Sequence, residues 1–179
     1  MNYVSNMPVE TLQTEVFTEI YNKYYSRIYK YILFRVGDHF LTEDLVSEVF
    51  EKVFLKYHTF TAEKGRFDAW LFTIANNTVI NYFKKNKHKL QTANLEKIEG
   101  KFRLEDLIIE QELKEFLLQA IMCLKERERN IIALKFGACL TNREIAQLLD
   151  LSESNVGTIL YRSLKHLKDI LKEKLAFTS

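Results

Sequence analysis

Apolar residues in the first half of the chain recur at steps of three and four positions, which is the spacing of one face of an α-helix. Three stretches show this pattern: residues 17–32, 45–57 and 67–83. The first pattern breaks near Gly37, and Thr42 is the predicted N-cap of the second helix. Residues 58–66 have no periodicity and contain a glycine, so they predict a loop. The pattern therefore predicts three helices within a first domain, residues 1–89.

The pattern changes in the middle of the chain. From about Asn86 to Asp106 apolar residues are isolated and charges alternate, which indicates a boundary between domains. We predict a polar linker over residues 90–109 and a C-terminal domain over residues 110–179. Periodicity resumes in that domain and predicts four short helices, with Gly137 as the C-cap of one of them.

Residues 141–165 carry the pattern of a helix-turn-helix. Thr141 and Glu144 form a T-x-x-E capping box at the start of a short amphipathic helix. The pattern is interrupted after that helix, and Ser152 is the predicted N-cap of a second one. Two capped helices in such short succession predict a tight helical pair.

A helix-turn-helix needs a small residue where its helices cross and a turn residue that tolerates the left-handed conformation. Ala146 meets the first requirement and Asp150 the second, while Val156 is placed to fill the junction between the helices. An ordinary helical hairpin is the alternative, but it does not require this combination of residues. We therefore favour the helix-turn-helix.

In a helix-turn-helix the second helix enters the major groove of DNA, with its N-terminal residues toward the base edges. The residues at this position are Glu153, Ser154, Asn155 and Thr158. Basic residues further along the helix would contact phosphates and position it without reading sequence: Arg162, Lys165 and Lys168. The pattern thus predicts DNA binding.

Composition narrows the fold class. With 1 Pro and 5 Gly among 179 residues, the chain has too few turn-forming residues for a β-sandwich or barrel. We predict an all-α protein with two small helical domains. The longest nearly apolar run, Ala69 to Ala75, is far shorter than the roughly 20 residues of a membrane-spanning helix. The N-terminus shows no secretory signal, so we expect no membrane insertion.

Cysteine and histidine usage gives no indication of catalysis. Cys123 and Cys139 fit neither a zinc-ligand spacing nor a disulfide framework, and we expect free thiols in a reducing cytoplasm. The histidines are scattered along the chain: His39, His58, His88 and His166. We expect no metal, no cofactor and no catalytic site.

The charge is clustered although the formal net charge is only +2. One basic cluster comprises Lys84, Lys85, Lys87 and Lys89, and a second runs from Arg162 to Lys174. An acidic cluster lies between Glu43 and Glu51. Each cluster taken alone is compatible with a solvated helix face.

Three segments together resemble the extracytoplasmic-function (ECF) sigma factors, the smallest promoter-recognition subunits of bacterial RNA polymerase. TEDLVSEVFEKVF (residues 42–54) resembles the polymerase-binding helix of that family, and FDAWLFTIANNTVINYFKKNK (residues 67–87) its helix for recognising and melting the minus-ten element. LKERERNIIALKF followed by LTNREIAQLLDLSESNVGTILYRSLKHLK resembles its domain for the minus-thirty-five element. The resemblance implies a factor that directs promoter recognition and transcription initiation from the cytoplasm.

The resemblance also implies binding sites. Melting requires a base to leave the stack, so the protein needs polar groups for the base edge and aromatic surface for exposed bases. The residues expected to serve the minus-ten region are Phe60, Asn77, Asn81, Tyr82, Lys84, Lys85 and Lys87. Trp70 lies among them, and we expect it to be a core residue. Gly157 lies in the first two turns after Ser152, on the side away from the core-facing Val156 and Leu160. It is either a tolerated defect of the helix or a groove-facing position where the missing side chain allows close approach to DNA.

The acidic second helix suits a basic partner surface, which in the family belongs to core RNA polymerase. The residues expected to bind it are Asp44, Leu45, Glu48, Phe50 and Glu51. The other partners implied are promoter DNA, both as duplex and as melted non-template strand, and an anti-sigma factor such as holds many members inactive.

The chain departs from the family at several positions. Many members have Arg where this chain has Asn76, Asp at the position of Asn81, and basic residues at the positions of Gly157 and Ile159. Affinity at the upstream element must therefore rest on Arg162, Lys165 and backbone groups.

Two other functions fit parts of the sequence. A dimeric helix-turn-helix regulator that acts without polymerase would explain residues 141–168, but it leaves residues 42–87 without a purpose. A helical adaptor that binds only proteins would make the basic clusters incidental. Binding of duplex DNA by the isolated chain would favour the regulator, and interactions insensitive to salt would favour the adaptor.

Overall fold

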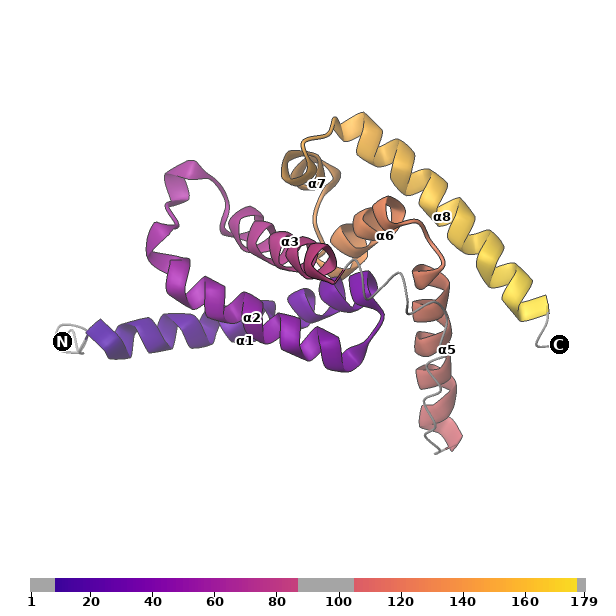
Figure 1. The fold of residues 1–179 in the computed structure, drawn as a ribbon, viewed down its shortest axis with the longest axis horizontal. Helices are drawn as coiled ribbons and strands as arrows, with labels where there is room; N and C mark the ends of the chain where they lie inside the picture. The colour runs from indigo at the N-terminus through magenta and orange to yellow at the C-terminus, as the bar shows by residue number, and fades with distance from the viewer. Residues whose placement is uncertain (1–8, 87–104, 177–179) are drawn as a thin grey trace, which may run out of the picture.

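The N-terminal half of the chain folds into three long helices and a short connecting loop. The computed structural model describes residues 9–86 and 105–176 (Figure 1). Residues 9–86, here the N-terminal half, contain α1 (Val9–Val36), α2 (His39–Lys56), the single turns η1 (Tyr57–Thr59) and η2 (Ala62–Lys64), and α3 (Phe67–Lys85). The predicted helices and the predicted loop are therefore confirmed.

Residues 105–176, here the C-terminal half, are also helical. They contain α5 (Glu105–Met122), α6 (Glu126–Ile132), the π-helical turn η3 (Ala133–Gly137), α7 (Asn142–Leu149) and α8 (Glu153–Ala176). All regular structure in the two described ranges is helical, as the composition predicts. Within these ranges every helix is too short or too polar to cross a bilayer.

The prediction of four short helices is wrong for α5 and α8, which have 18 and 24 residues. The apolar face of α8 continues beyond the helix-turn-helix, through Leu167 to Ile170 and Leu171, and packs there against Ile121 of α5. In Figure 1 these two helices form the right side of the molecule, with α6 between them and the N-terminal half. The extra turns of α8 are stabilised by this packing.

The start of α2 differs from the prediction. Gly37 adopts a φ of 72°, which ends α1, and Asp38 is the N-cap because its carboxylate accepts a 2.7 Å hydrogen bond from the Leu41 amide. Thr42 lies one turn inside the helix, where it is buried and its hydroxyl donates to the Asp38 carbonyl at 2.6 Å. The cap is thus Asp38, and Thr42 closes the first turn.

Gly137 has a different role from the predicted C-cap. Cys139, not Gly137, takes the left-handed conformation there, with a φ of 56°. A Cβ atom on Gly137 would lie 2.8 Å from both the Cα and the backbone nitrogen of Tyr31. This position requires glycine because the backbone of η3 packs directly onto the backbone of α1.

The two halves share one hydrophobic core. Its buried residues come from all three long N-terminal helices and from α6, η3, α7 and α8, and include Ile28, Val49, Leu71, Leu134 and Val156. A smaller cluster around Ala120 and Ile121 joins α5 to α8. Helix α1 is central, since it packs against α2 and α3 of the N-terminal half and against α5, α6 and η3 of the C-terminal half.

A buried arginine also connects the halves. Arg35 of α1 is only 1% exposed, donates to the side chains of Tyr31 and Asn130, and lies 3.7 Å from the Glu126 carboxylate. The Nε atoms of Arg35 and Arg129 are buried without a hydrogen-bond partner in the described part of the chain. Burial and the nearby Arg35 charge lower the pKa of Arg129. The contact between the halves therefore contains buried charge as well as apolar packing, and removing that charge from water costs free energy.

Candidate nucleic-acid interface

The structure confirms the helix-turn-helix and its predicted caps. The Thr141 hydroxyl accepts from the Glu144 amide at 3.2 Å, and the Glu144 carboxylate accepts from the Thr141 amide at 2.8 Å. Burial alone would raise the pKa of Glu144, but the hydrogen bonds that its carboxylate accepts from the Thr141 amide and, at 2.7 Å, from the Thr141 hydroxyl hold the pKa below its ordinary value. Ser152 caps α8 by accepting from the Asn155 amide at 3.1 Å.

The turn between α7 and α8 has the expected geometry. Asp150 has φ and ψ of 53° and 53°, in the left-handed region, and the Leu151 amide donates to the Ala146 carbonyl at 2.9 Å. Ala146 is 5% exposed and Val156 is fully buried, so the helices meet at a small residue and a β-branched one. The local sequence thus fixes the angle at which α8 leaves the domain.

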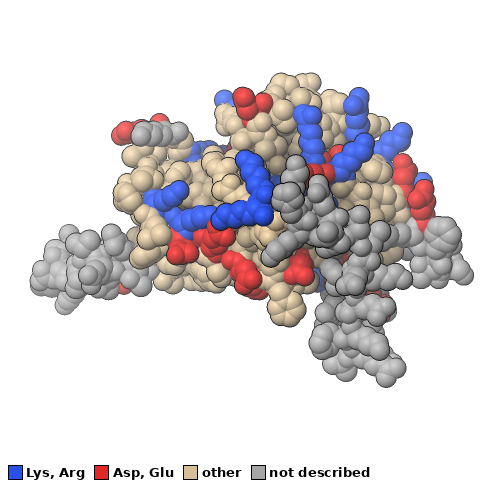
Figure 2. All heavy atoms as spheres, viewed as in Figure 1, with Lys and Arg blue, Asp and Glu red and all other residues tan. Residues whose placement is uncertain are grey.

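The predicted groove-facing side chains lie on the free surface of α8. Glu153, Ser154, Asn155 and Thr158 are exposed, and the Thr158 hydroxyl donates to the Ser154 carbonyl at 3.0 Å. The basic residues expected to contact phosphate are also exposed: Arg162, Lys165 and Lys168. Figure 2 shows basic side chains projecting along α8. The N-terminal turns of α8 therefore present their polar side chains to solvent.

Gly157 lies within this surface and is half-buried. A Cβ atom there would meet only the Asn142 side-chain nitrogen, at 3.9 Å, which is an ordinary contact. The fold itself therefore leaves room for a side chain at this position, in contrast to Gly137.

Helix α3 exposes most of the residues predicted for the minus-ten region. Asn77, Asn81, Lys84 and Lys85 are exposed, and Tyr82 is half-buried. The predicted contact residue Lys87 lies outside the described residues. The exposed amides and ammonium groups line the outer face of the helix toward its C-terminal end, where they offer hydrogen-bond donors and acceptors beside positive charge.

Asn76, by contrast, points into the protein. It is 6% exposed, and its side-chain oxygen accepts from the Tyr31 hydroxyl at 3.0 Å and from Arg35 at 3.4 Å. The side chain of Asn76 is therefore a structural amide, held by residues of α1. The spacing of Asn76 from the buried Phe72 and Val79 is the signal that identifies its inward orientation.

Aromatic side chains gather where the loop enters α3. The rings of Phe60 and Trp70 lie 5.6 Å apart, and both pack on Phe67. They line a shallow hollow of 260 Å³ together with Arg66 and Thr73. We predicted that Trp70 is a core residue, but it is only half-buried, because one side of its ring remains open to this hollow.

Ionic contacts fix this loop and the start of α3. Asp68 accepts hydrogen bonds from the Tyr24 hydroxyl at 2.6 Å and from Arg27 at 3.0 Å. Burial and the Asp68 carboxylate raise the pKa of Tyr24 to about 12. Burial alone would raise the pKa of Asp68, but these hydrogen bonds and the Arg27 charge hold it below its ordinary value. Arg66 pairs with Glu144 of α7 at 2.9 Å.

The predicted polymerase-binding residues of α2 fall into two groups. Leu45 and Phe50 are each 3% exposed and belong to the core, so their assignment to a partner surface is wrong. Asp44 and Glu51 are exposed, while Glu48 is half-buried and pairs with Lys52. Acidic side chains gather along α2 on the face shown in Figure 2.

Each half of the chain matches a known protein family. Sigma-70 region 2 matches residues 20–89, and Sigma-70, region 4, matches residues 115–167. RNA polymerase sigma factor YlaC of Bacillus subtilis is 31% identical over 156 residues, covering 84% of this chain and 88% of YlaC. ECF RNA polymerase sigma factor BldN of Streptomyces coelicolor is 30% identical over 164 residues, covering 90% of this chain but only 62% of BldN.

A solved structure shows the same fold. The sigma factor RpoE of Bartonella quintana, in complex with the anti-sigma factor NepR, has a TM-score of 0.70 at 19% identity, and the match covers 88% of this chain and 98% of RpoE. The region 2 match contains α3 with its exposed face, and the region 4 match contains the helix-turn-helix. The identity to YlaC indicates the same family. The chain therefore belongs to the ECF family of RNA polymerase sigma factors.

Proposed function

We propose that the two domains predicted from the sequence bind different partners in transcription initiation by this ECF sigma factor. Residues 1–89 bind core RNA polymerase and open the minus-ten element, and residues 110–179 bind the minus-thirty-five element. Residues 90–109 join them, and the end of this linker is helical from Glu105. The observation that carries the proposal is that one chain exposes a capped helix-turn-helix, an amide- and lysine-rich face on α3 and an acidic face on α2.

At the minus-thirty-five element, α8 enters the major groove. Glu153, Ser154, Asn155 and Thr158 have side chains that can hydrogen-bond to base edges, and Gly157 brings the backbone close. Arg162 and Lys165 contact phosphates on the flanking backbone. Most of the affinity at this element then depends on salt, because the cations displace counterions from the DNA.

At the minus-ten element, α3 and the preceding loop bind melted DNA. Asn77 and Asn81 offer hydrogen bonds to an unstacked base, Phe60 and Tyr82 offer aromatic surface, and the lysines attract the non-template strand. The lysines assigned to this task are Lys84, Lys85 and Lys87. The lost strand pairing is thereby replaced by stacking and hydrogen bonds to the protein.

Polymerase supplies the catalytic chemistry of transcription, so we propose that this chain contributes recognition and strand opening alone, in the cytoplasm where polymerase acts. The acidic face of α2, with Asp44, Glu48 and Glu51, binds a basic surface of core polymerase. We further propose control by an anti-sigma factor, since the structurally similar RpoE was determined with such a partner. A dimeric regulator would leave the surfaces of α2 and α3 unused.

Transcription in vitro tests the proposal as a whole. The full chain is combined with core polymerase from its host on fragments of the host genome, and start sites are mapped. We expect initiation downstream of a shared pair of sequence elements only when the chain is present. Gel shifts complete the test, because a sigma factor should bind duplex promoter with polymerase, whereas a self-sufficient regulator should bind it alone.

Charge reversal tests the polymerase surface. Asp44→Lys combined with Glu48→Lys should abolish association with core polymerase and leave the fold intact, because an exposed charge and a single pair at the surface such as Glu48–Lys52 contribute little to stability. Glu112→Lys combined with Glu173→Lys changes the net charge equally at exposed sites on α5 and α8 and should retain binding. Co-purification of the α2 variant at wild-type yield would contradict the assignment.

A further inference from the structure

The outer side of α2 carries more than acidic residues. Phe40, Asp44, Ser47, Glu51 and Leu55 follow one another at steps of three or four residues, which keeps them on one side of the helix. All five are exposed, and the buried residues of α2 lie on its opposite side. We call these five residues the outer stripe. It consists of an acidic middle with a large apolar side chain at each end.

The apolar ends are unusually open for their residue types. Phe40 is 87% exposed and Leu55 is 60% exposed. Their positions are about 22 Å apart along the helix axis. Single exposed apolar residues are common on protein surfaces. Phe40 and Leu55, however, lie on a helix whose opposite face is packed in the core, so their positions are fixed. Both lie on the same side of that helix as Asp44 and Glu51, which are proposed to contact a partner.

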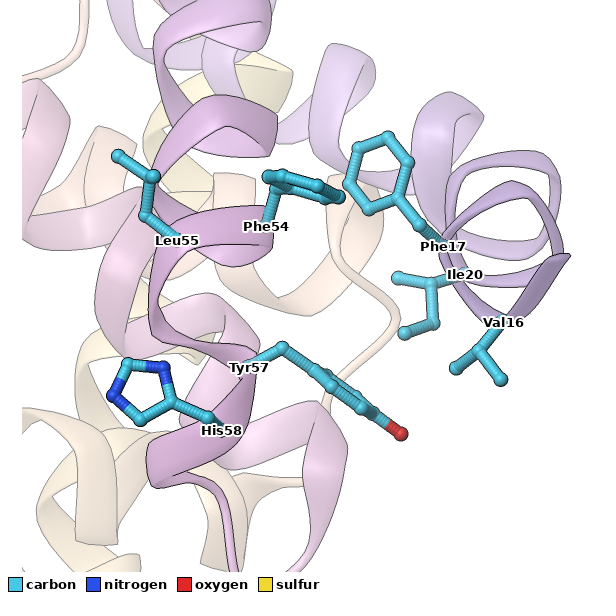
Figure 3. A pocket seen from close by; sticks show the side chains of 7 residues that line it. All are labelled: Val16, Phe17, Ile20, Phe54, Leu55, Tyr57 and His58. Carbon is cyan, nitrogen blue, oxygen red and sulfur yellow. The ribbon is translucent and has the colours of Figure 1, made fainter. Parts of the chain in front are cut away.

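The end of the stripe at Leu55 adjoins a hollow. The hollow has a volume of 370 Å³ and lies between α1 and the end of α2, with mostly apolar lining: Val16, Phe17, Ile20, Phe54, Leu55, Tyr57 and His58. In Figure 3, Phe54 and Tyr57 project toward the α1 residues, and Leu55 and His58 lie on the other side of the α2 ribbon. A partner's apolar side chain can be accommodated here, whereas Phe40 protrudes at the opposite end.

The charges between these ends are only partly neutralised within the protein. Glu43 accepts a hydrogen bond from Tyr25 at 3.1 Å, and Glu48 pairs with Lys52. Asp44 and Glu51 have no ion pair in the described part of the chain, and both lie on the outer stripe. The middle of the stripe is therefore complementary to a basic surface.

We propose that Phe40 and Leu55 are the apolar anchors of the polymerase interface, and that Asp44 and Glu51 guide its formation. The inference rests on the proposed function, because the occupant it assigns to the outer stripe is the basic surface of core polymerase. Buried aromatic anchors carry much of the binding energy of protein interfaces and slow dissociation. Rim charges mainly accelerate association and lose their effect in salt.

The apolar anchors and the charged residues should therefore affect the rates of binding differently. The full chain is captured on core polymerase from its host, and association and dissociation rates are measured at low and high salt. Phe40→Ala should weaken binding at least about tenfold at both salt concentrations, mainly through faster dissociation. Leu55→Ala should act in the same direction. Asp44→Asn combined with Glu51→Gln should slow association at low salt, with an effect that fades at high salt.

Control variants separate this role from a general effect on folding. Leu113→Ala removes an equally exposed leucine, 62% exposed, from α5 and should bind as the wild type does. Unchanged thermal midpoints for all variants are expected, since Phe40 makes little contact with the fold.

Each result bears on a definite claim. Wild-type rates for both Phe40→Ala and Leu55→Ala, on a chain that binds polymerase, would overturn the anchors and leave the proposed function in place. Weaker binding of Leu113→Ala to the same extent would overturn them too, because the effect would then not be specific to the outer stripe. Failure of the wild-type chain to bind core polymerase would overturn the proposed function itself.

Discussion

The guanidinium group of Arg27 donates two hydrogen bonds to the backbone carbonyl of Ala138, at 2.9 Å from Nε and 2.6 Å from Nη2. A third hydrogen bond from the same group, at 3.0 Å, binds the carboxylate of Asp68. Arg27 thus joins helix α1, the start of α3 and the segment after η3 at one point. The two halves of the protein are positioned by side chain to backbone contacts as well as by their shared apolar core.

Gly137, where the backbone of η3 lies against the backbone of α1, provides a test of the contact between the two halves. Gly137→Ala should lower the free energy of unfolding by about 1–3 kcal/mol, because the new methyl group meets the backbone of Tyr31, which cannot rotate away. Urea denaturation of the full chain measures the effect. An unchanged midpoint would show that the halves separate in solution and that the contact is not maintained.

Adjacent asparagines on α3 should behave in opposite ways. Asn76→Ala removes the nearer acceptor of the Tyr31 hydroxyl and should cost about 1–3 kcal/mol of stability. Asn77→Ala, at an exposed site, should change stability by less than about 0.5 kcal/mol. It should instead weaken strand opening by about 1–3 kcal/mol if its hydrogen bonds to an extruded base are not replaced.

Permanganate footprinting of thymines in the opened region measures this second effect. Asn77→Ala should reduce thymine reactivity and transcription on the native promoter, and a pre-melted template should restore transcription. Normal reactivity on the native promoter would contradict the role of Asn77 in melting. Polymerase binding should be retained in this variant, since α2 is unchanged.

Asp68 predicts a specific dependence of stability on pH. Its pKa is lower in the folded protein than the ordinary value of 3.8, so its contribution to stability is complete above that value and is lost as the pH falls through the folded pKa. Asp68→Asn should lower stability at neutral pH and make the loss below about pH 4 less steep. Glu173→Gln, at an exposed site, is the control. Parallel stability curves for wild type and Asp68→Asn would contradict the prediction.

Gly157 should trade stability against recognition. Gly157→Ala should raise stability by about 1 kcal/mol, because glycine is unfavourable inside a helix and the site has room for a methyl group. If α8 approaches the groove closely here, the same change should reduce transcription from promoters that carry the upstream element. Gly157→Lys should instead steepen the salt dependence of binding. Equal activity of the Ala variant with and without the upstream element would exclude a recognition role.

The sequence predicts features that depend on neighbouring residues. The capping box at Thr141, the left-handed turn at Asp150 and the cap at Ser152 are each set within a few positions, and the structure contains all of them. Contacts between distant residues leave no such pattern. The burial of Asn76 depends on Tyr31 and Arg35, which come from another helix.

The errors on α2 have two different causes. Leu45 and Phe50 are part of the apolar periodicity that identified the helix, so their burial follows from the same pattern and their assignment to a partner surface was inconsistent with it. Phe40 was missed because it precedes the predicted cap at Thr42. Only the true start of the helix, with Asp38 as its cap, places Phe40 on the outer side of α2.

The close approach of η3 to α1 also limits how this protein can be recombined with its relatives. The atoms that exclude a side chain at position 137 are backbone atoms of Tyr31, so no substitution of Tyr31 itself makes room for one. A chimera that joins this N-terminal half to the C-terminal half of another sigma factor should therefore fold in the same arrangement only if the incoming half carries glycine at the equivalent position. Exchange of promoter specificity between family members would then depend on a residue that contacts no DNA.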